Sequence, residues 1–299
     1  MRVVALAGLL LTFCVGCGHA TTATSAGGGL RVVAAENFWG SIAAQLGGTK
    51  ARVTSVITSP ATDPHDYEPT AADARTIAGA RMVIVNGVGY DPWASKLIAA
   101  NPISHRIVLD VGDLVGIKPG GNPHRWYSPP DVKRVIGAIV RDYAKLDPKD
   151  SAYFAQRQTR FETQSLSRYR HLIASIKRKY HGVPVGASES IFAPLAQSLG
   201  LKLLTPYSFL KAISEGTEPT AADKTTIDHQ IAARLIEVWV YNSQNSTPDV
   251  KRITDAARKN GIAITTITET LTPPSASFQD WQSRQLQALA AALARATGR

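Results

Sequence analysis

Thiols are what this 299-residue sequence has least of. It contains two cysteines, Cys14 and Cys17, and both lie in the first 17 positions. A chain that is cut before Cys17 and acylated there keeps no free thiol. A disulfide framework, a thiolate metal site and cysteine catalysis are therefore excluded for the mature body.

Long apolar runs and a basic stripe are also missing from the body. After the first 16 positions no apolar run reaches the roughly 18 residues that a membrane-spanning helix needs. The net charge is +10, but lysine and arginine are scattered among acids, and the densest cluster, Lys177, Arg178 and Lys179, has no interleaved aromatic side chains. We therefore expect no nucleic-acid partner.

Hydrolase motifs are absent as well. No His-Glu-x-x-His occurs, which excludes the metalloprotease helix. The segment Ser188-Glu189-Ser190 lacks the glycine flanks of a nucleophile elbow. These absences favour a protein that is not an enzyme.

The first 16 residues are typical of an export signal. Arg2 supplies a basic start, residues 3–15 are apolar, and small residues follow. The end of this segment, Val15-Gly16-Cys17, is similar to a bacterial lipobox, which predicts lipidation of Cys17. Residues 17–30 are rich in serine, threonine, alanine and glycine, which predicts a lipid-anchored tether.

The remaining chain alternates between short β-branched runs and alanine-rich helical segments, which predicts parallel βαβ units. The runs are residues 31–35, 52–57, 82–86, 106–110, 183–187, 202–205, 237–241 and 262–267. Between the fourth and fifth run there is no strand candidate, only a helical stretch to Leu146, a break at Asp147-Pro148, and a second helical run. The pattern predicts an α/β fold of two lobes with parallel sheets joined by a long helix. The predicted divisions are an N-terminal lobe at 31–148, a connecting helix at 149–180 and a C-terminal lobe at 181–299.

An internal repeat supports two related lobes. Residues 68–73 read Glu-Pro-Thr-Ala-Ala-Asp, and residues 218–223 read the same. In both copies a threonine precedes an aspartate by three residues, as at a capped helix start. Each predicted helix leads into a strand that ends in an asparagine, Asn86 or Asn242.

Two histidines follow strand ends in Pro-His pairs, His65 after the strand at 52–57 and His124 after the strand at 106–110. Ligands of open parallel sheets gather outside the carboxyl ends of strands. The preceding proline restricts the backbone, which lowers the entropy lost when a ligand is held. The second lobe offers Glu189 and Glu269 at strand ends. Imidazoles with carboxylates form a suitable shell for a borderline divalent ion.

These motifs resemble one family. They are Asp-Pro-His-Asp-Tyr-Glu-Pro at 63–69, Asn-Pro-His-Arg-Trp at 122–126, Glu189 followed by Ile-Phe-Ala-Pro-Leu at 191–195, and Glu-Pro-Thr at 218–220. Together, over residues 30–297, they resemble the zinc/manganese-binding solute-binding proteins of bacterial ABC importers. The resemblance implies two α/β lobes joined by one rigid helix, with the metal held between them at four loop positions.

The resemblance carries the first three metal ligands onto His65, His124 and Glu189. The family usually has an aspartate at the fourth position, and the best match here is Glu269, which is one methylene longer. Four alternatives for the fourth ligand stay open, namely Asn245, Glu215, Asp228 and water.

The resemblance also implies the function. We expect extracytoplasmic capture of a divalent transition-metal ion, Zn²⁺ in preference to Mn²⁺, and its delivery to an ABC permease with its ATPase. The protein would be a monomer, lipid-anchored through Cys17 at the outer face of the cell membrane. Two alternatives are a mononuclear zinc hydrolase and a carrier of a metal chelate or haem, in which His65 would be incidental. An additional adhesin role is also left open.

Overall fold

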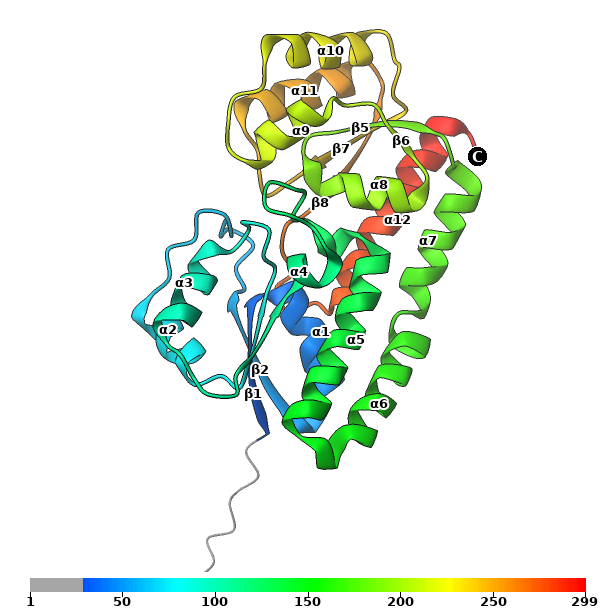
Figure 1. The fold of residues 1–299 in the computed structure, drawn as a ribbon. Coiled ribbons are helices and arrows are strands. Elements are labelled where there is room, and N and C mark those ends of the chain that lie inside the picture. Colours follow the sequence, from blue (N-terminus) through cyan, green and yellow to red (C-terminus); the bar gives the residue numbers. More distant parts are fainter. Residues whose placement is uncertain (1–28) are drawn as a thin grey trace, which may run out of the picture.

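The computed structural model describes residues 29–299. The predicted signal, Cys17 and almost all of the predicted tether lie outside the described residues. Two sheets of four parallel strands dominate the architecture, which confirms the α/β fold with parallel sheets (Figure 1). Within residues 29–299, none of the helices combines the length and the apolar character that a bilayer crossing requires.

The first sheet has the strand order β2-β1-β3-β4 and the second has β6-β5-β7-β8, so the two have the same topology. The strands of the first sheet are β1 (Leu30–Glu36), β2 (Ala51–Ile57), β3 (Met82–Val85) and β4 (Ile107–Asp110). Those of the second are β5 (Pro184–Ala187), β6 (Lys202–Leu203), β7 (Val238–Asn242) and β8 (Ala263–Ile267). Each of the eight predicted runs overlaps one of these strands, because β-branched clustering is a local property that burial then reinforces.

Helices cover both faces of each sheet. In the first half they are α1 (Asn37–Gly47), α2 (Ala71–Ala78), α3 (Pro92–Ala100), α4 (Val111–Val115) and α5 (Pro129–Leu146). In the second half they are α8 (Ala193–Leu199), α9 (Tyr207–Ser214), α10 (Ala221–Ala232), α11 (Pro248–Lys259) and α12 (Phe278–Thr297). The repeat marks equivalent helices, since Thr70 caps α2 by accepting from the Asp73 amide and Thr220 caps α10 by accepting from the Asp223 amide.

The helical run predicted for residues 149–180 is interrupted. It comprises α6 (Ser151–Arg160), a π-helical turn (Phe161–Ser165) and α7 (Ser167–Tyr180). The buried side chains explain the turn. Phe161 and Leu166 are both buried and lie five residues apart, a spacing that rotates an α-helix by about 140°. The π turn, closed by the Leu166 amide on the Phe161 carbonyl at 2.9 Å, absorbs the extra residue and keeps both on the inner face.

One core runs through both lobes. Its buried members include Val32 and Trp126 from the first half and Val185 and Leu293 from the second. Two smaller clusters lie on the outer faces of the sheets, under α2 and α3 and under α9, α10 and α11. The two lobes therefore share one main core and do not have separate ones.

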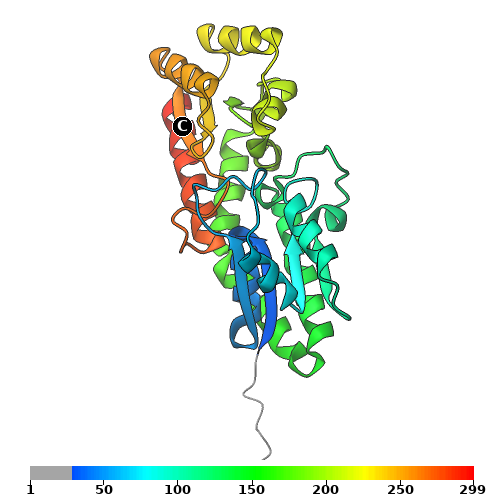
Figure 2. The same ribbon diagram turned by 90° about the vertical axis from the view of Figure 1, so that its left-hand side faces the viewer.

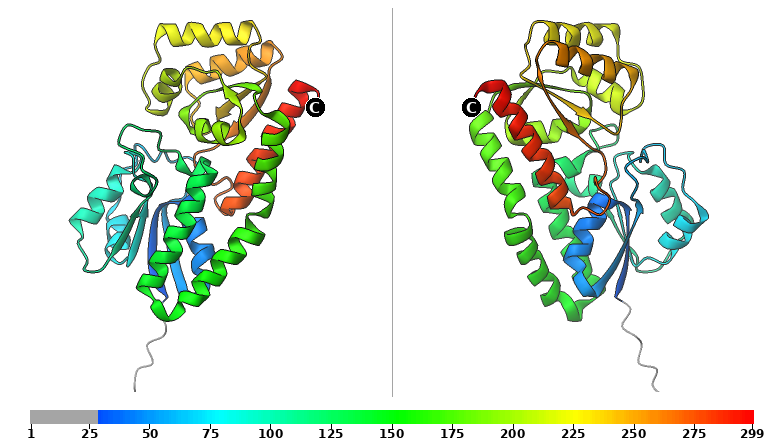
Figure 3. Two further views of the ribbon diagram at one scale, coloured as in Figure 1. Left: turned by 45° about the vertical axis from the view of Figure 1, so that its right-hand side comes forward. Right: turned by 180° about the vertical axis from the view of Figure 1, so that it is seen from behind.

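The C-terminal helix explains this continuity. α12 begins against α1, where the Phe278 amide donates to Ser41 Oγ at 2.9 Å, and then runs along α7 to the end of the chain (Figures 2 and 3). It thus reaches from the first half into the second. The domain limits remain our proposal, with α12 as a helix that both lobes share.

Candidate metal centre

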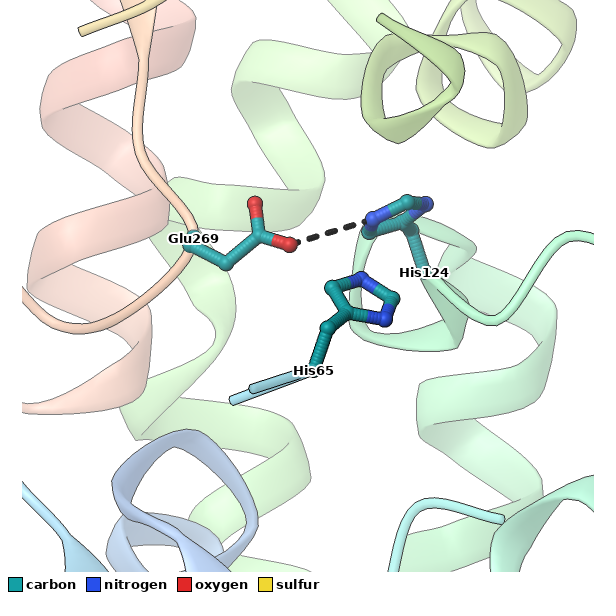
Figure 4. A group of neighbouring side chains, drawn as sticks. All are labelled: His65, His124 and Glu269. Atoms are coloured by element: carbon teal, nitrogen blue, oxygen red, sulfur yellow. Dashed lines mark hydrogen bonds and ion pairs between the residues drawn. The ribbon is translucent and has the colours of Figure 1, made fainter. Parts of the chain in front are cut away.

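Four predicted site residues come from loops at the carboxyl ends of strands in both sheets. His65 follows β2, His124 follows β4 and α4, Glu189 follows β5, and Glu269 follows β8. Both sheets direct these ends toward the junction of the two lobes, so residues far apart in the chain meet there. Figure 4 shows three of the side chains pointing toward one another.

His65, His124 and Glu269 form the closest group. One potential ligand atom from each lies within 4.8 Å of the others. His124 has no exposed surface and Glu269 is 9% exposed. His124 Nε2 lies 3.1 Å from Glu269 Oε1 (Figure 4). Both atoms bind a metal ion only when they carry no proton.

The His124 ring is oriented from behind by Asn122. The Asn122 Oδ1 atom accepts from the His124 backbone amide at 3.0 Å and faces Nδ1 at 2.9 Å. This acceptor assigns a proton to Nδ1 and leaves Nε2 as the atom that faces the site. Asn122 Nδ2 in turn donates to the Ser190 carbonyl at 2.7 Å, which ties the loop to the second half of the chain.

His65 supplies a buried nitrogen with no partner among the described residues. Its Nε2 is buried and makes no hydrogen bond. The ring stands edge-on to Tyr90 with centroids 4.6 Å apart. Burial lowers the pKa of His65, and the charge of His124 lowers it further, against the opposing effect of Glu269. A neutral imidazole with a free lone pair is the form that binds a metal.

Glu269 is held as a carboxylate. Its Oε1 accepts from Tyr90 Oη at 3.3 Å and its Oε2 from Asn242 Nδ2 at 3.0 Å. Burial by itself would raise the pKa of Glu269, but the charge and the hydrogen bond of His124 outweigh burial and hold that pKa below its ordinary value.

Glu189 lies behind this group rather than in it. It is 2% exposed, its Oε2 accepts from Asn242 Nδ2 at 3.1 Å, and its Oε1 is buried without a partner among residues 29–299. Burial, followed by the negative charge of Glu269, raises the pKa of Glu189 well above its ordinary value. The Asn242 amide is therefore shared by two carboxylates of opposite protonation tendency.

A cavity of about 70 Å³ opens onto these groups. That is enough for an ion with a few water molecules. It is lined mainly by loop residues after β2 and by polar side chains of the second half, including Asp63, His65, Glu189, Asn242, Asn245 and Glu269.

The remaining candidates for the fourth ligand are placed differently. Asn245 lines the cavity, and its Nδ2 donates to the Ile213 carbonyl at 3.4 Å. Glu215 is exposed and pairs with Lys211 at 3.6 Å, while Asp228 pairs with Arg252 at 2.8 Å on the surface. Among the glutamate and aspartate candidates, Glu269 alone is in the three-residue group.

The sequence analysis missed the supporting residues Asn122, Tyr90 and Asn242. For Asn242 a signal existed, because both repeat copies lead to a strand-end asparagine. Its counterpart Asn86 donates to the Pro123 carbonyl at 2.9 Å and so holds the loop that carries His124. Nothing in the sequence pattern marks Tyr90, whose hydroxyl meets Glu269 across 179 positions of chain.

A family described as the periplasmic component A of the zinc-uptake complex (ZnuA) matches residues 32–292. The manganese-binding lipoprotein MntA of Halalkalibacterium halodurans is 29% identical over 44% of this chain and 45% of that protein, so this match spans about half of its length. The manganese ABC transporter substrate-binding lipoprotein PsaA of Streptococcus pneumoniae is 23% identical over 82% of this chain and 83% of that protein. The zinc-binding protein TroA of Treponema pallidum is 24% identical over 68% of this chain and 67% of that protein.

Solved structures share the fold. A Mn-bound periplasmic metal-binding protein from Candidatus Liberibacter asiaticus superposes with a TM-score of 0.72 at 19% identity, covering 88% of this chain and 98% of that one. A crystal structure of ZnuA superposes with a TM-score of 0.69 at 22% identity, covering 90% of this chain and 99% of that one. At these identities the likeness shows the fold.

Proposed function

We propose, from the family to which this chain belongs, that the protein captures a divalent transition-metal ion outside the cell and delivers the ion to an ABC permease. The family is that of the periplasmic zinc-uptake component A, which comprises solute-binding proteins of ABC importers and not enzymes. The family assignment therefore excludes the hydrolase alternative. A chelate or haem carrier is disfavoured by the cavity, since organic ligands of that size occupy pockets of about 300–1,000 Å³ and this one measures about 70 Å³.

We propose His65, His124, Glu189 and Glu269 as the ligands of the ion. The observation that carries this proposal is the set of buried lone pairs aimed at one small cavity, where His65 Nε2 and Glu189 Oε1 have no partner within residues 29–299. Buried polar atoms are rarely left unpaired, because each unmade hydrogen bond costs about 1–3 kcal/mol. An ion that accepts these lone pairs removes that cost.

Zinc is the ion we favour. Imidazole suits zinc, and the general affinity order puts zinc far above manganese at a given site. Manganese stays the alternative, because two of the four proposed ligands are carboxylates and because MntA and PsaA are described as manganese proteins, whereas TroA is described as a zinc protein.

Metal loading would link the two lobes. The histidines come from the first half of the chain and the glutamates from the second, so one ion would bridge both. Because the core and α12 are shared by both halves, we propose that loading rearranges the loops around Glu189 and Glu269 more than it swings whole lobes.

We further propose that lipidation at Cys17 keeps the protein on the outer face of the cell membrane, close to its permease. A lipoprotein carries several acyl chains and is held firmly, unlike a protein with a single chain. Intact mass of the purified protein tests this, and an unmodified Cys17 in the mature protein contradicts it.

The decisive experiment is a competition titration of the purified apo protein with Zn²⁺ and Mn²⁺. His65→Ala and His124→Ala each lower the affinity at least a hundredfold, because loss of a direct ligand exceeds the 10–100-fold that loss of a supporting partner causes. His171→Ala, which alters an exposed histidine of α7, is the matched control and leaves the affinity unchanged. A wild-type protein that binds neither ion, or alanine variants that bind like wild type, contradicts the proposal.

A further inference from the structure

A cluster of three arginines lies at the end of the molecule opposite the second lobe. Arg31 in β1, Arg52 in β2 and Arg75 in α2 surround one shallow depression of about 250 Å³. All three are exposed, and the residues lining the depression include no aspartate or glutamate. None of the three makes an ion pair with an acidic side chain of residues 29–299.

The proximity of these like charges destabilises the folded state. Arg31 and Arg52 are direct neighbours on adjacent parallel strands, about 4.8 Å apart across the sheet. Like charges in that position destabilise a sheet. Three like charges around one depression without an acidic side chain in its lining are suited to an anion that comes from outside the chain.

Structural roles account for part of the triad only. A charged side chain such as Arg52 protects an edge strand, and β2 is an edge. Arg75 lies in the last turn of α2, where a cation offsets the helix dipole. Arg31 has neither role, because β1 is interior to the sheet and Arg31 lies directly beside the like charge of Arg52.

The position of the arginine cluster near the proposed lipid anchor indicates which anion it binds. The described chain begins at Gly29, two residues before Arg31, and β1 starts near the lower end of the molecule in Figures 1 and 2, beside the turn between α5 and α6. The 12 steps along the chain from Cys17 to Gly29 span at most about 40 Å even when fully extended. With the lipid anchor of the proposed function, this end of the protein therefore stays next to the headgroups of the bilayer, at a high effective concentration.

We propose that Arg31, Arg52 and Arg75 form a docking surface for the phosphate groups of anionic phospholipids. Guanidinium groups bind phosphate oxygens in pairs and remain charged at any physiological pH. Docking by this end stands the molecule on the bilayer and holds the metal cavity, which lies at the opposite ends of the strands, away from the surface and open for capture. The inference rests on the proposed function only through the anchor at Cys17.

The test uses the acylated protein in lipid nanodiscs made of phosphatidylcholine alone or with phosphatidylglycerol added. A fluorophore on Thr76→Cys, inside the depression, reports proximity through quenching by headgroup-labelled lipids. Intact mass confirms the acyl group beforehand, and a metal titration of the same sample keeps failure of docking separate from failure of metal binding.

Quenching is expected in the anionic discs, and it weakens as salt screens the charges. Each arginine near an anionic surface contributes about fivefold to the docking equilibrium, so Arg31→Gln, Arg52→Gln and Arg75→Gln together lower it about a hundredfold. The matched control, Lys177→Gln, Arg178→Gln and Lys179→Gln, removes the same charge from the densest cluster in the sequence and leaves docking unchanged. The single Arg52→Gln variant, expected to lose about fivefold, serves if the triple variant folds poorly.

Three results overturn the proposal. Equal quenching in both kinds of disc removes the role of anionic lipid. An equal loss in the Lys177 control set shows that only net charge matters. Release by inorganic phosphate, at an ionic strength matched with chloride, shows that free phosphate and not a lipid headgroup is the ligand.

Discussion

Replacing Glu189 by glutamine is expected to stabilise the apo protein and to lower its affinity for metal. Glu189 is buried, and its Oε1 has no partner among residues 29–299. Burial and the charge of Glu269 raise the pKa of Glu189 well above its ordinary value. The folded state therefore binds this proton more tightly than the unfolded state does, and stability falls as the pH rises from about 4.3 through the folded-state pKa.

The size of the effect follows from the buried charge. Folding raises the pKa of Glu189, each pKa unit between the folded and the unfolded state is worth about 1.4 kcal/mol, and glutamine has a similar shape but does not ionise. For a domain of this size about 1 kcal/mol corresponds to roughly 2–4 °C in Tm, so Glu189→Gln is expected to raise the apo Tm by several degrees near neutral pH. The gain disappears below the unfolded-state pKa of about 4.3, where both side chains are neutral.

Bound metal is expected to reverse the order of thermal stability between wild type and Glu189→Gln. A ligand present at about a hundred times its Kd stabilises the folded state by about 2.7 kcal/mol. Wild type gains this on loading, whereas Glu189→Gln gains far less at the same metal concentration if Glu189 is a ligand. Thermal melts with and without Zn²⁺, at acidic and neutral pH, measure both effects.

The matched control is Glu215→Gln. Glu215 is exposed and pairs with Lys211, so its substitution changes stability by less than about 1 kcal/mol and leaves metal loading unaltered. The reasoning is refuted if apo Glu189→Gln melts below wild type at neutral pH, or if it keeps the full stabilisation by metal.

Three further outcomes are expected. Asn242→Ala lowers metal affinity about 10–100-fold in a competition titration, because the amide that orients Glu189 and Glu269 is lost; wild-type affinity would assign it no such role. The lowered pKa of His65 contributes stability that is complete above about pH 6.5 and is lost as the pH falls through the folded-state pKa. Urea unfolding of the apo protein across that range should therefore show a steeper acid loss in wild type than in His65→Gln, and parallel curves would contradict it. Small-angle scattering should show little change in radius of gyration on loading, since the shared core resists lobe motion; a large contraction would oppose the loop mechanism.

Much of the fold could be predicted from short-range patterns. The β-branched runs that became β1 to β8, the Asp147-Pro148 break after α5, and the threonine caps of α2 and α10 all depend on neighbours within a few residues. The rule that ligands gather at the carboxyl ends of parallel strands then brought His65 and His124 to one place.

Other features depend on contacts that no local window contains. The π turn after α6 is set by which side chains the two lobes bury, and α12 reaches α1 across more than two hundred residues of chain. Only the tertiary structure distinguishes the roles of Glu189 and Glu269. Both are strand-end glutamates in the sequence, but Glu269 lies against His124, whose charge lowers the pKa of Glu269, while Glu189 faces that negative charge from behind a shared amide.

The sequence by itself determined the elements, their order and the candidate ligands, because periodicity, caps and strand ends are local. Only the tertiary structure decided how those ligands are protonated and supported and why one core serves both lobes. Burial and Coulombic interactions depend on which distant segments come into contact, and that information is created when the chain folds.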